Sequence, residues 1–435
     1  MSPLPFPVRA LSFEARALLT RLERVRPFAL LTPTVAAAGL ERRAGQAIER
    51  HLAHGRRAVR TRVGRFLGWL HGREGSAASP AEAQRRFVFL KLRFNAALTQ
   101  LDIFADALVQ RSEHETGVFL GGLDVAAADA LRLARPLFEA PPLITYLDRG
   151  VGAAIRRART RLPGGGENPV AIVRVPRERM VGSGIAASLM HEVGHQGAAL
   201  LDLVTTLREA LKRRQAETAP GIEYQAWGLW ERWISEIVAD FWAVATVGVA
   251  ATQGLMGVVS LPRAFVFRIQ TDDPHPFPWV RARLSAAMGG VLFPDPQWQR
   301  LSDLWAAFYS PEGLDEERRR LLDALEKTMP AFVRLLVEHR SRNLQGARLA
   351  ELFPLAERSP ERLRELAAFY SRRPEALRRA RPTLAFAVLG QAKQDGRLSP
   401  EKESSLTAEL LTHWALRRVM GNPGTTAAAP TALAA

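Results

Sequence analysis

The sequence contains no cysteine among its 435 residues. This absence excludes a disulfide framework, a thiolate nucleophile and any zinc or iron site with sulfur ligands. A metal ion bound by this protein must therefore be held by histidine and carboxylate side chains.

A secretory signal is also missing from the beginning of the sequence. Residues 1–7 read Met-Ser-Pro-Leu-Pro-Phe-Pro and lack a basic segment followed by an apolar run. We therefore expect a cytoplasmic protein, peripheral to a membrane at most. The composition, with 47% hydrophobic and 24% charged residues, is typical of a folded chain that buries a core in one large domain or two.

Acidic residues are too few to balance the basic ones, which leaves a formal net charge of +16. Residues 41–73 hold nine arginines and only two glutamates. Such a region attracts an acidic protein partner, an anionic lipid surface or nucleic acid. A solvated basic face is the common alternative, and the sequence contains no specific nucleic-acid motif.

Helical patterns dominate the sequence. The basic region carries apolar residues at helical spacing over residues 48–70, which predicts an amphipathic helix whose apolar face docks on the protein itself. Ser-Pro pairs at 79, 310, 359 and 399 predict four further helix starts, with serine as the cap and proline in the first turn. Two or three helices are expected over residues 83–139, and more after residue 291.

Two stretches depart from this pattern. A glycine-rich loop at 163–169 precedes Val-Ala-Ile-Val-Arg-Val at 170–175, the clearest strand candidate. Residues 241–262 contain no charge but include polar residues and three glycines, so we expect a buried helix or helix pair rather than a membrane span.

These patterns predict a mainly α-helical fold with a small β element. We expect a basic helical region at 1–78, a helical region at 79–150, a core with a short edge sheet at 151–290, a helical region at 291–420 and a disordered tail at 421–435.

The sequence His-Glu-Val-Gly-His occupies residues 191–195. In a helix, residues four apart share a face, so His191 and His195 can bind one metal ion while Glu192 points toward an adjacent water molecule. Catalytic zinc needs a third protein ligand and an open position. A histidine-extended site is excluded, because Ala198 and Leu201 occupy the required positions.

The third ligand must then come from a second helix. Glu236 lies 41 residues after His195 in a strongly apolar helical pattern, and Asp240 follows one turn later. Asp240 is well placed to accept a hydrogen bond from an imidazole and so to orient it. Glu231 and Glu223 are the alternative ligands, but neither has an aspartate four residues on.

A third segment, Asp-Pro-His-Pro-Phe-Pro-Trp-Val-Arg, occupies residues 273–281. Together the three segments resemble the gluzincin zinc peptidases of the Ste24 and HtpX type over about residues 170–290. The resemblance implies a zincin-like catalytic core that binds one Zn²⁺ through His191, His195 and Glu236. It further implies that Asp240 supports the ligands, that His275 steadies the oxyanion and that Arg281 holds the local structure.

The sequence therefore predicts a zinc metalloendopeptidase that cuts a peptide or protein substrate. Zinc activates a water molecule, and Glu192 accepts its proton. The strand at 170–175, with Ile172, Val173 and Arg174, is expected to form the sheet edge on which an extended substrate adds. Two alternatives stay open: a zinc-binding regulatory or scaffold protein without proteolytic activity, and a basic protein that binds nucleic acid or an anionic membrane.

Overall fold

The computed structural model describes residues 5–24, 28, 34–148, 153–163, 165–177, 182–270 and 272–420. The predicted disordered tail at 421–435 lies outside these residues. The chain forms two compact units, of which the first contains Met1–Leu120, Pro141–Tyr146 and Arg156–Ile172. The second contains Gly121–Ala140, Leu147–Ile155 and Val173–Ala435. The five consecutive regions expected from the sequence stay a prediction.

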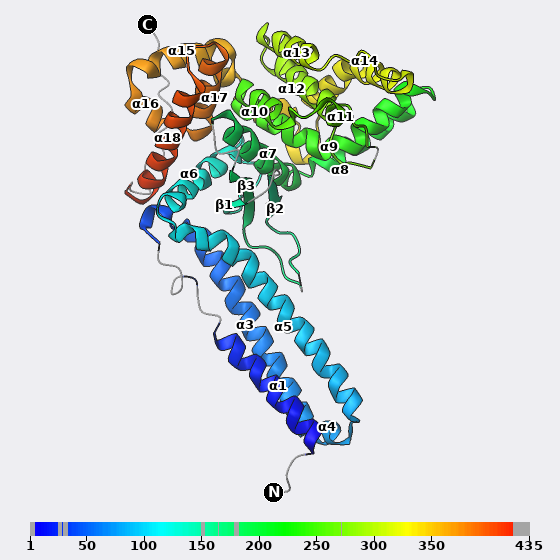
Figure 1. Ribbon diagram of the computed structural model, residues 1–435, viewed down its shortest axis with the longest axis vertical. Helices are drawn as coiled ribbons and strands as arrows, with labels where there is room; N and C mark the ends of the chain where they lie inside the picture. The colour runs from blue at the N-terminus through cyan, green and yellow to red at the C-terminus, as the bar shows by residue number, and fades with distance from the viewer. Residues whose placement is uncertain are drawn as a thin grey trace. The chain divides into compact units, whose positions relative to one another are not determined.

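The fold is mainly α-helical with one small sheet, as the composition and periodicity predict (Figure 1). The sheet has three strands in the order β1-β3-β2, where β1 is Leu143–Asp148, β2 is Ala154–Arg156 and β3 is Ala171–Pro176. Among the described residues no helix has both the length and the apolar character that crossing a membrane requires.

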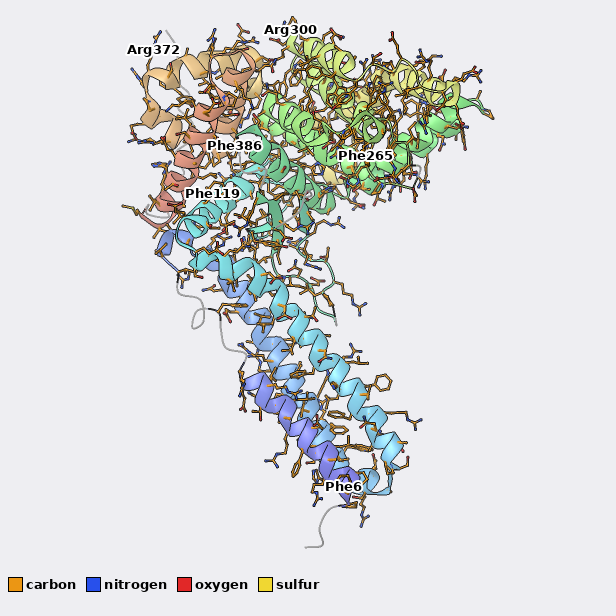
Figure 2. The ribbon with its side chains drawn as sticks, viewed as in Figure 1. Phe6, Phe119, Phe265, Arg300, Arg372 and Phe386 are labelled. Atoms are coloured by element: carbon orange, nitrogen blue, oxygen red, sulfur yellow. The ribbon has the colours of Figure 1, made fainter. Side chains whose placement is uncertain are left out.

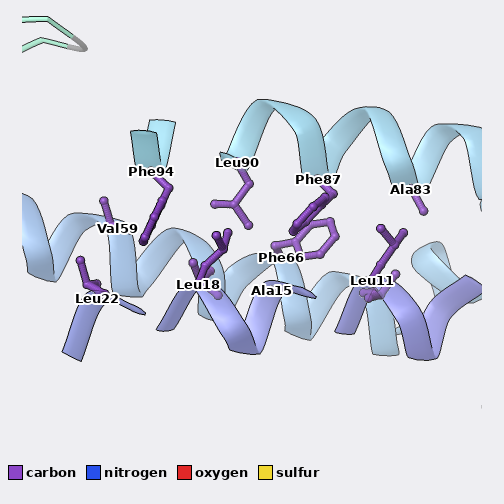
Figure 3. Packing of buried hydrophobic residues seen from close by; sticks show 12 residues of the cluster. Leu11, Ala15, Leu18, Leu22, Val59, Phe66, Ala83, Phe87, Leu90 and Phe94 are labelled. Atoms are coloured by element: carbon purple, nitrogen blue, oxygen red, sulfur yellow. The ribbon is translucent and has the colours of Figure 1, made fainter. Parts of the chain in front are cut away.

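Long helices build the first unit: α1 (Phe6–Glu23), α3 (Arg42–His71) and α5 (Pro80–Val109), with the short α4 (Arg73–Ala77) between the last two. They lie side by side and bury a continuous apolar stripe (Figure 3). The six apolar residues of the basic segment all face inward: Ile48, Leu52, Val59, Val63, Phe66 and Leu70. The prediction that this helix docks on its own protein is confirmed.

The connecting helix α6 (His114–Ala130) leads to the sheet, and the second unit continues with the helices after β3. Their bounds are α7 (Ser183–Leu200), α8 (Leu203–Ala216), α9 (Ile222–Val247), α10 (Val249–Val259), α11 (Arg263–Val266), α12 (Pro278–Leu292), α13 (Gln297–Phe308), α14 (Glu316–Glu338), α15 (Pro360–Arg372), α16 (Pro374–Arg379), α17 (Pro382–Gln394) and α18 (Pro400–Met420). Short 3₁₀ turns complete the two units at Ala36–Ala38, Gln110–Ser112, Arg342–Leu344, Leu349–Leu352 and Leu355–Arg358.

Helices α7 and α9 pack closely because α7 carries glycine where α9 carries tryptophan. A Cβ atom added to Gly197 would lie 2.2 Å from the indole of Trp242, and one added to Gly194 would lie 3.0 Å from the Ala239 backbone. Buried apolar side chains surround α9 on nearly every side, as expected for a helix in the centre of a large core. This packing fixes the relative position of the two helices that carry the candidate site.

The uncharged run at 241–262 forms the end of α9 and the whole of α10, separated at Gly248. Gly248 has φ +60°, a conformation that glycine adopts without strain. Residues 249–252 and Gly254 of α10 are buried, and Gly254 lies directly against Ala187 of α7. The expected buried helix pair is confirmed.

Three of the four predicted Ser-Pro helix starts are confirmed. Ser79, Ser359 and Ser399 each accept a hydrogen bond from the backbone three residues on, at the beginnings of α5, α15 and α18. Helices α17 and α18 pack through Phe386, labelled in Figure 2, which lies edge-to-face on Trp414 with 5.6 Å between ring centroids.

The start predicted at Ser310 is wrong. Ser310 accepts a hydrogen bond from Glu312 two residues on, and Gly313 then takes φ +78° and turns the chain. Helix α14 begins only at Glu316, with Asp315 as its cap. The turn at Gly313 separates Ser310 from the helix, and Asp315 caps α14 in its place.

Candidate metal centre

Helix α7 presents two imidazoles on one face. His191 and His195 lie one turn apart, with 4.8 Å between ring centroids and the ring planes nearly perpendicular. Their side chains are 15% and 17% exposed. Both side chains are therefore largely buried, with a small part of each open.

Helix α9 brings Glu236 to these two nitrogens. Its Oε2 atom lies 3.3 Å from His191 Nε2, and its Oε1 atom lies 3.5 Å from His195 Nε2. One ligand atom from each residue lies within 4.8 Å of the others, so the three side chains can hold one metal ion.

The residues present fit a zinc ion on two further observations. Within the described chain, Oε2 of Glu236 is buried and accepts no hydrogen bond, although imidazole nitrogens surround it. Two ligand atoms about 2.05 Å from a tetrahedral zinc are about 3.3 Å apart, close to the two nitrogen–oxygen distances observed. The His191, His195 and Glu236 ligand atoms are therefore as far apart as the ligands of one metal ion, and Oε2 of Glu236 is not paired by a hydrogen bond.

The far side of His191 is fixed by a buried ion pair. Its Nδ1–H donates to Asp240 Oδ1 at 2.8 Å, and its Nε2 atom faces Glu236. Arg281 of α12 donates to both oxygens of Asp240, from Nε at 2.7 Å and from Nη2 at 2.8 Å. Such a carboxylate behind a ligating histidine orients the ring and increases its basicity.

These contacts shift the pKa values of the groups involved. Burial favours the neutral form of Asp240, but the Arg281 guanidinium and then His191 outweigh it and lower the pKa of Asp240 to about 2. Burial also opposes charge on His191, yet Asp240 and Glu236 raise the pKa of this imidazole to about 9. Burial favours the neutral form of Glu236, but the three neighbouring imidazoles outweigh it and hold the pKa of this carboxyl well below the usual range.

Glu192 follows His191 on α7, and its residue is only 5% exposed. It makes no hydrogen bond to any residue that the structure describes, and it lines a cavity of about 230 Å³ beside the imidazoles. Burial raises the pKa of Glu192, while His191 and His195 partly oppose that change. A carboxylate with a raised pKa and free oxygen atoms is suited to accept and return a proton.

His275 approaches the site from the segment before α12. Its Nε2 atom lies 3.3 Å from Glu236 Oε2, and its Nδ1 atom lies 2.8 Å from Asp273 Oδ1. The nearby carboxylate of Glu236 raises the pKa of His275, although burial opposes this. Asp273, to which the sequence analysis gave no role, holds His275 as Asp240 holds His191.

The structure thus brings together all seven residues that the three sequence motifs supply: His191, Glu192, His195, Glu236, Asp240, His275 and Arg281. The two alternative ligands form ion pairs elsewhere. Glu231 pairs with Arg208 at 3.2 Å, and Glu223 pairs with Lys327 at 2.5 Å. Glu236 is the glutamate of α9 that faces the imidazoles.

The prediction of a substrate-binding edge at Ile172, Val173 and Arg174 is wrong. These residues belong to β3, which is the central strand with β1 and β2 on its two sides. Ile172 and Val173 are buried, and Arg174 pairs with Asp148 of β1 at 3.2 Å. A strand with neighbours on both sides does not offer the free backbone groups that strand addition requires.

Sequence reasoning also missed the wall of the cavity. Ser188, Leu255 and Ser285 line it, from α7, α10 and α12. Leu255 lies inside the uncharged run, where most residues are apolar and have the character of core residues. Only the packing of α10 on α7 distinguishes the positions that face the cavity.

Comparison of the chain with protein-family models, with curated proteins and with solved structures gave no match.

Proposed function

We propose that this protein is a zinc metallopeptidase with a zincin-like core, in which His191, His195 and Glu236 hold the metal ion. The observation that carries the proposal is the convergence of two imidazoles and one buried carboxylate at ligand spacing, beside a glutamate with free oxygen atoms. Three protein ligands of this kind are typical of catalytic zinc, which keeps a further position open for water.

When bound, zinc supplies Lewis acidity that lowers the pKa of water and polarises a carbonyl group. Glu192 is the general base: it takes the proton of the attacking water and returns it to the nitrogen of the leaving amine. Its burial supports this role, because a raised pKa brings the carboxylate closer to the pH at which it must exchange a proton.

His275 is the second group that can act on the substrate. With Nδ1 held by Asp273, its Nε2–H can donate a hydrogen bond to the oxygen on which negative charge develops. Asp240 and Arg281 are positioning residues, since they contact His191 rather than the cavity centre.

Metal analysis and proteolysis test the proposal with four variants. We expect wild type to bind one zinc ion, and His191→Ala and Glu236→Ala to lose it. Glu192→Gln should keep zinc but cut a denatured protein at least 100-fold more slowly, because general-base catalysis contributes about 10²–10⁴ in rate. Glu231→Gln, on the same helix as Glu236 but paired with Arg208, is the matched control and should match wild type.

Two outcomes would contradict the proposal. Full zinc affinity in Glu236→Ala would show that the third ligand is a different residue. Zinc bound by wild type without cleavage of any member of a peptide library would favour the zinc-binding regulatory or scaffold protein instead.

A further inference from the structure

The cavity beside the candidate metal centre is lined by two chemically different sets of residues. Every charged or titratable group that lines it belongs to the metal centre: His191, Glu192, Asp240, His275 and Arg281. The rest of the lining consists mainly of small and aliphatic residues, and those from α9 and α10 include Val244, Ala251, Leu255 and Val258. Figure 1 shows α9 and α10 next to α7, which carries the histidines.

The size of the cavity suits a substrate side chain. A cavity of about 150 Å³ with aliphatic walls accommodates benzene, and this one measures about 230 Å³ including the space beside its polar residues. Leu255 and Val258 are partly exposed, although they belong to a helix that otherwise packs against α7. They form the boundary that an entering side chain would contact.

Ser188 supplies one polar group in this wall. It lies one helical turn before His191 and is 6% exposed, and in the described part of the chain its Oγ atom has no hydrogen-bond partner. The other lining hydroxyl, Ser285 Oγ, is paired with Thr252 at 2.8 Å. A buried hydroxyl without a partner is costly unless a ligand or water satisfies it, so Ser188 points to a bound polar atom.

We propose that this cavity receives the uncharged side chain of the substrate residue next to the scissile bond, and that Leu255 and Ser188 determine which side chains fit. The inference rests on the proposed function. Where the substrate side chain contacts α10, the cavity selects aliphatic and hydroxyl-bearing side chains against acidic and basic ones, because the residues that α10 contributes to the lining carry no charge.

The test measures binding, so that it does not depend on cleavage. The probes are N-acetyl amino-acid hydroxamates, which bind zinc through their hydroxamate group and differ only in the side chain. With the full-length, zinc-loaded protein we expect the leucine compound to bind about 10–100-fold more tightly than the glycine compound. The aspartate and lysine compounds should gain nothing over glycine.

Two variants assign the effect to the cavity wall. Leu255→Trp fills the apolar part of the cavity and should abolish the preference for leucine over glycine. Leu304→Trp is the matched control, because this leucine of α13 is 43% exposed and does not line the cavity. Ser188→Ala should leave binding of the valine compound unchanged but weaken the isosteric threonine compound about tenfold, since it removes the hydroxyl partner.

Equal affinities for the leucine and glycine compounds, or no binding of either, would overturn the inference. So would a leucine preference that survives in Leu255→Trp. Failure of the proposed function would give a different result. The protein would then bind the hydroxamates with the expected dependence on the side chain but would cleave no peptide.

Discussion

The buried pair between Asp240 and Arg281 allows stability and zinc affinity to be separated. Their side chains are only 6% and 13% exposed, and two hydrogen bonds of 2.7 and 2.8 Å join them. Removing one partner leaves the other charge buried, which typically costs about 3–5 kcal/mol. We expect a value near the lower end for Asp240→Val, because Glu236 and Glu192 also stabilise the Arg281 cation.

Replacing both partners has a different effect on stability. In Asp240→Val with Arg281→Met no charge of the pair remains buried, and exchange of a buried ion pair for apolar residues is often neutral. The free energy of unfolding of the zinc-free protein, measured in urea, should return to within about 1–2 kcal/mol of wild type.

Zinc affinity should not recover in the double variant. His191 has lost the acceptor of its Nδ1–H in both Asp240→Val and the double variant, and loss of such a partner costs about 10–100-fold in metal affinity. Arg281→Met keeps the hydrogen bond from His191 to Asp240, so its zinc affinity should change less than tenfold. Competition with a chromophoric chelator measures these affinities.

A pair with a buried aspartate outside the site is the control for this experiment. Asp129 and Arg381 lie 3.0 Å apart, with side chains 6% and 37% exposed. Asp129→Val should therefore lower stability and leave zinc affinity unchanged. The reasoning is refuted if the double variant is as unstable as either single one, or if it binds zinc as tightly as wild type.

Three further predictions concern packing, pH and metal. Gly194→Ala should destabilise the protein by about 1–3 kcal/mol and weaken zinc binding, because the new Cβ atom meets the Ala239 backbone at 3.0 Å and pushes α7 away from α9. The control is Gly257→Ala, which should be neutral or stabilising because nothing lies within 4 Å of the new Cβ atom. Equal urea midpoints for the two variants would contradict this prediction. Burial, and then Arg213, lowers the pKa of His339 from 6.5 to about 4. Between these two pH values the imidazole is protonated in the unfolded chain but neutral in the folded one. Stability should then fall as pH drops from about 6.5 toward 4, and His339→Gln should lose about 1–2 kcal/mol less than wild type between pH 7 and pH 5; parallel curves would rule out this role. Zinc at a thousandfold excess over its dissociation constant should stabilise wild type by about 4 kcal/mol but not Glu236→Ala, and an equal rise in the melting temperature of both would point to another zinc site.

The parts of the fold and site that the sequence predicts are those set by local geometry. The spacing of His191 and His195 places both on one face because the period of a helix is fixed, and the same period places Asp240 one turn from Glu236. The inward face of α3 follows from its apolar spacing for the same reason. No knowledge of the tertiary structure is needed for these steps.

The order of strands and the position of the cavity require tertiary information. Residues 170–175 have the composition of a strand, but the sequence does not state which strands pair with it, and β3 proved to be central rather than an edge. Leu255 cannot be distinguished from its neighbours by hydropathy, since the whole run is uncharged. Its exposure to the cavity depends on Gly254, which allows α10 to approach α7.

The imidazole of His191 contacts residues from all three sequence motifs, and the charges around it are those that a metal ion would have to balance. When a bound metal ion keeps the histidines neutral, the buried carboxylates of Glu192, Glu236 and Asp240 and the guanidinium of Arg281 together carry a charge of −2. Buried charge is costly unless it is paired or bound to a metal, and one divalent cation balances these two charges. The ion would contact the Nε2 side of His191, while Asp240 and Arg281 hold its Nδ1 side.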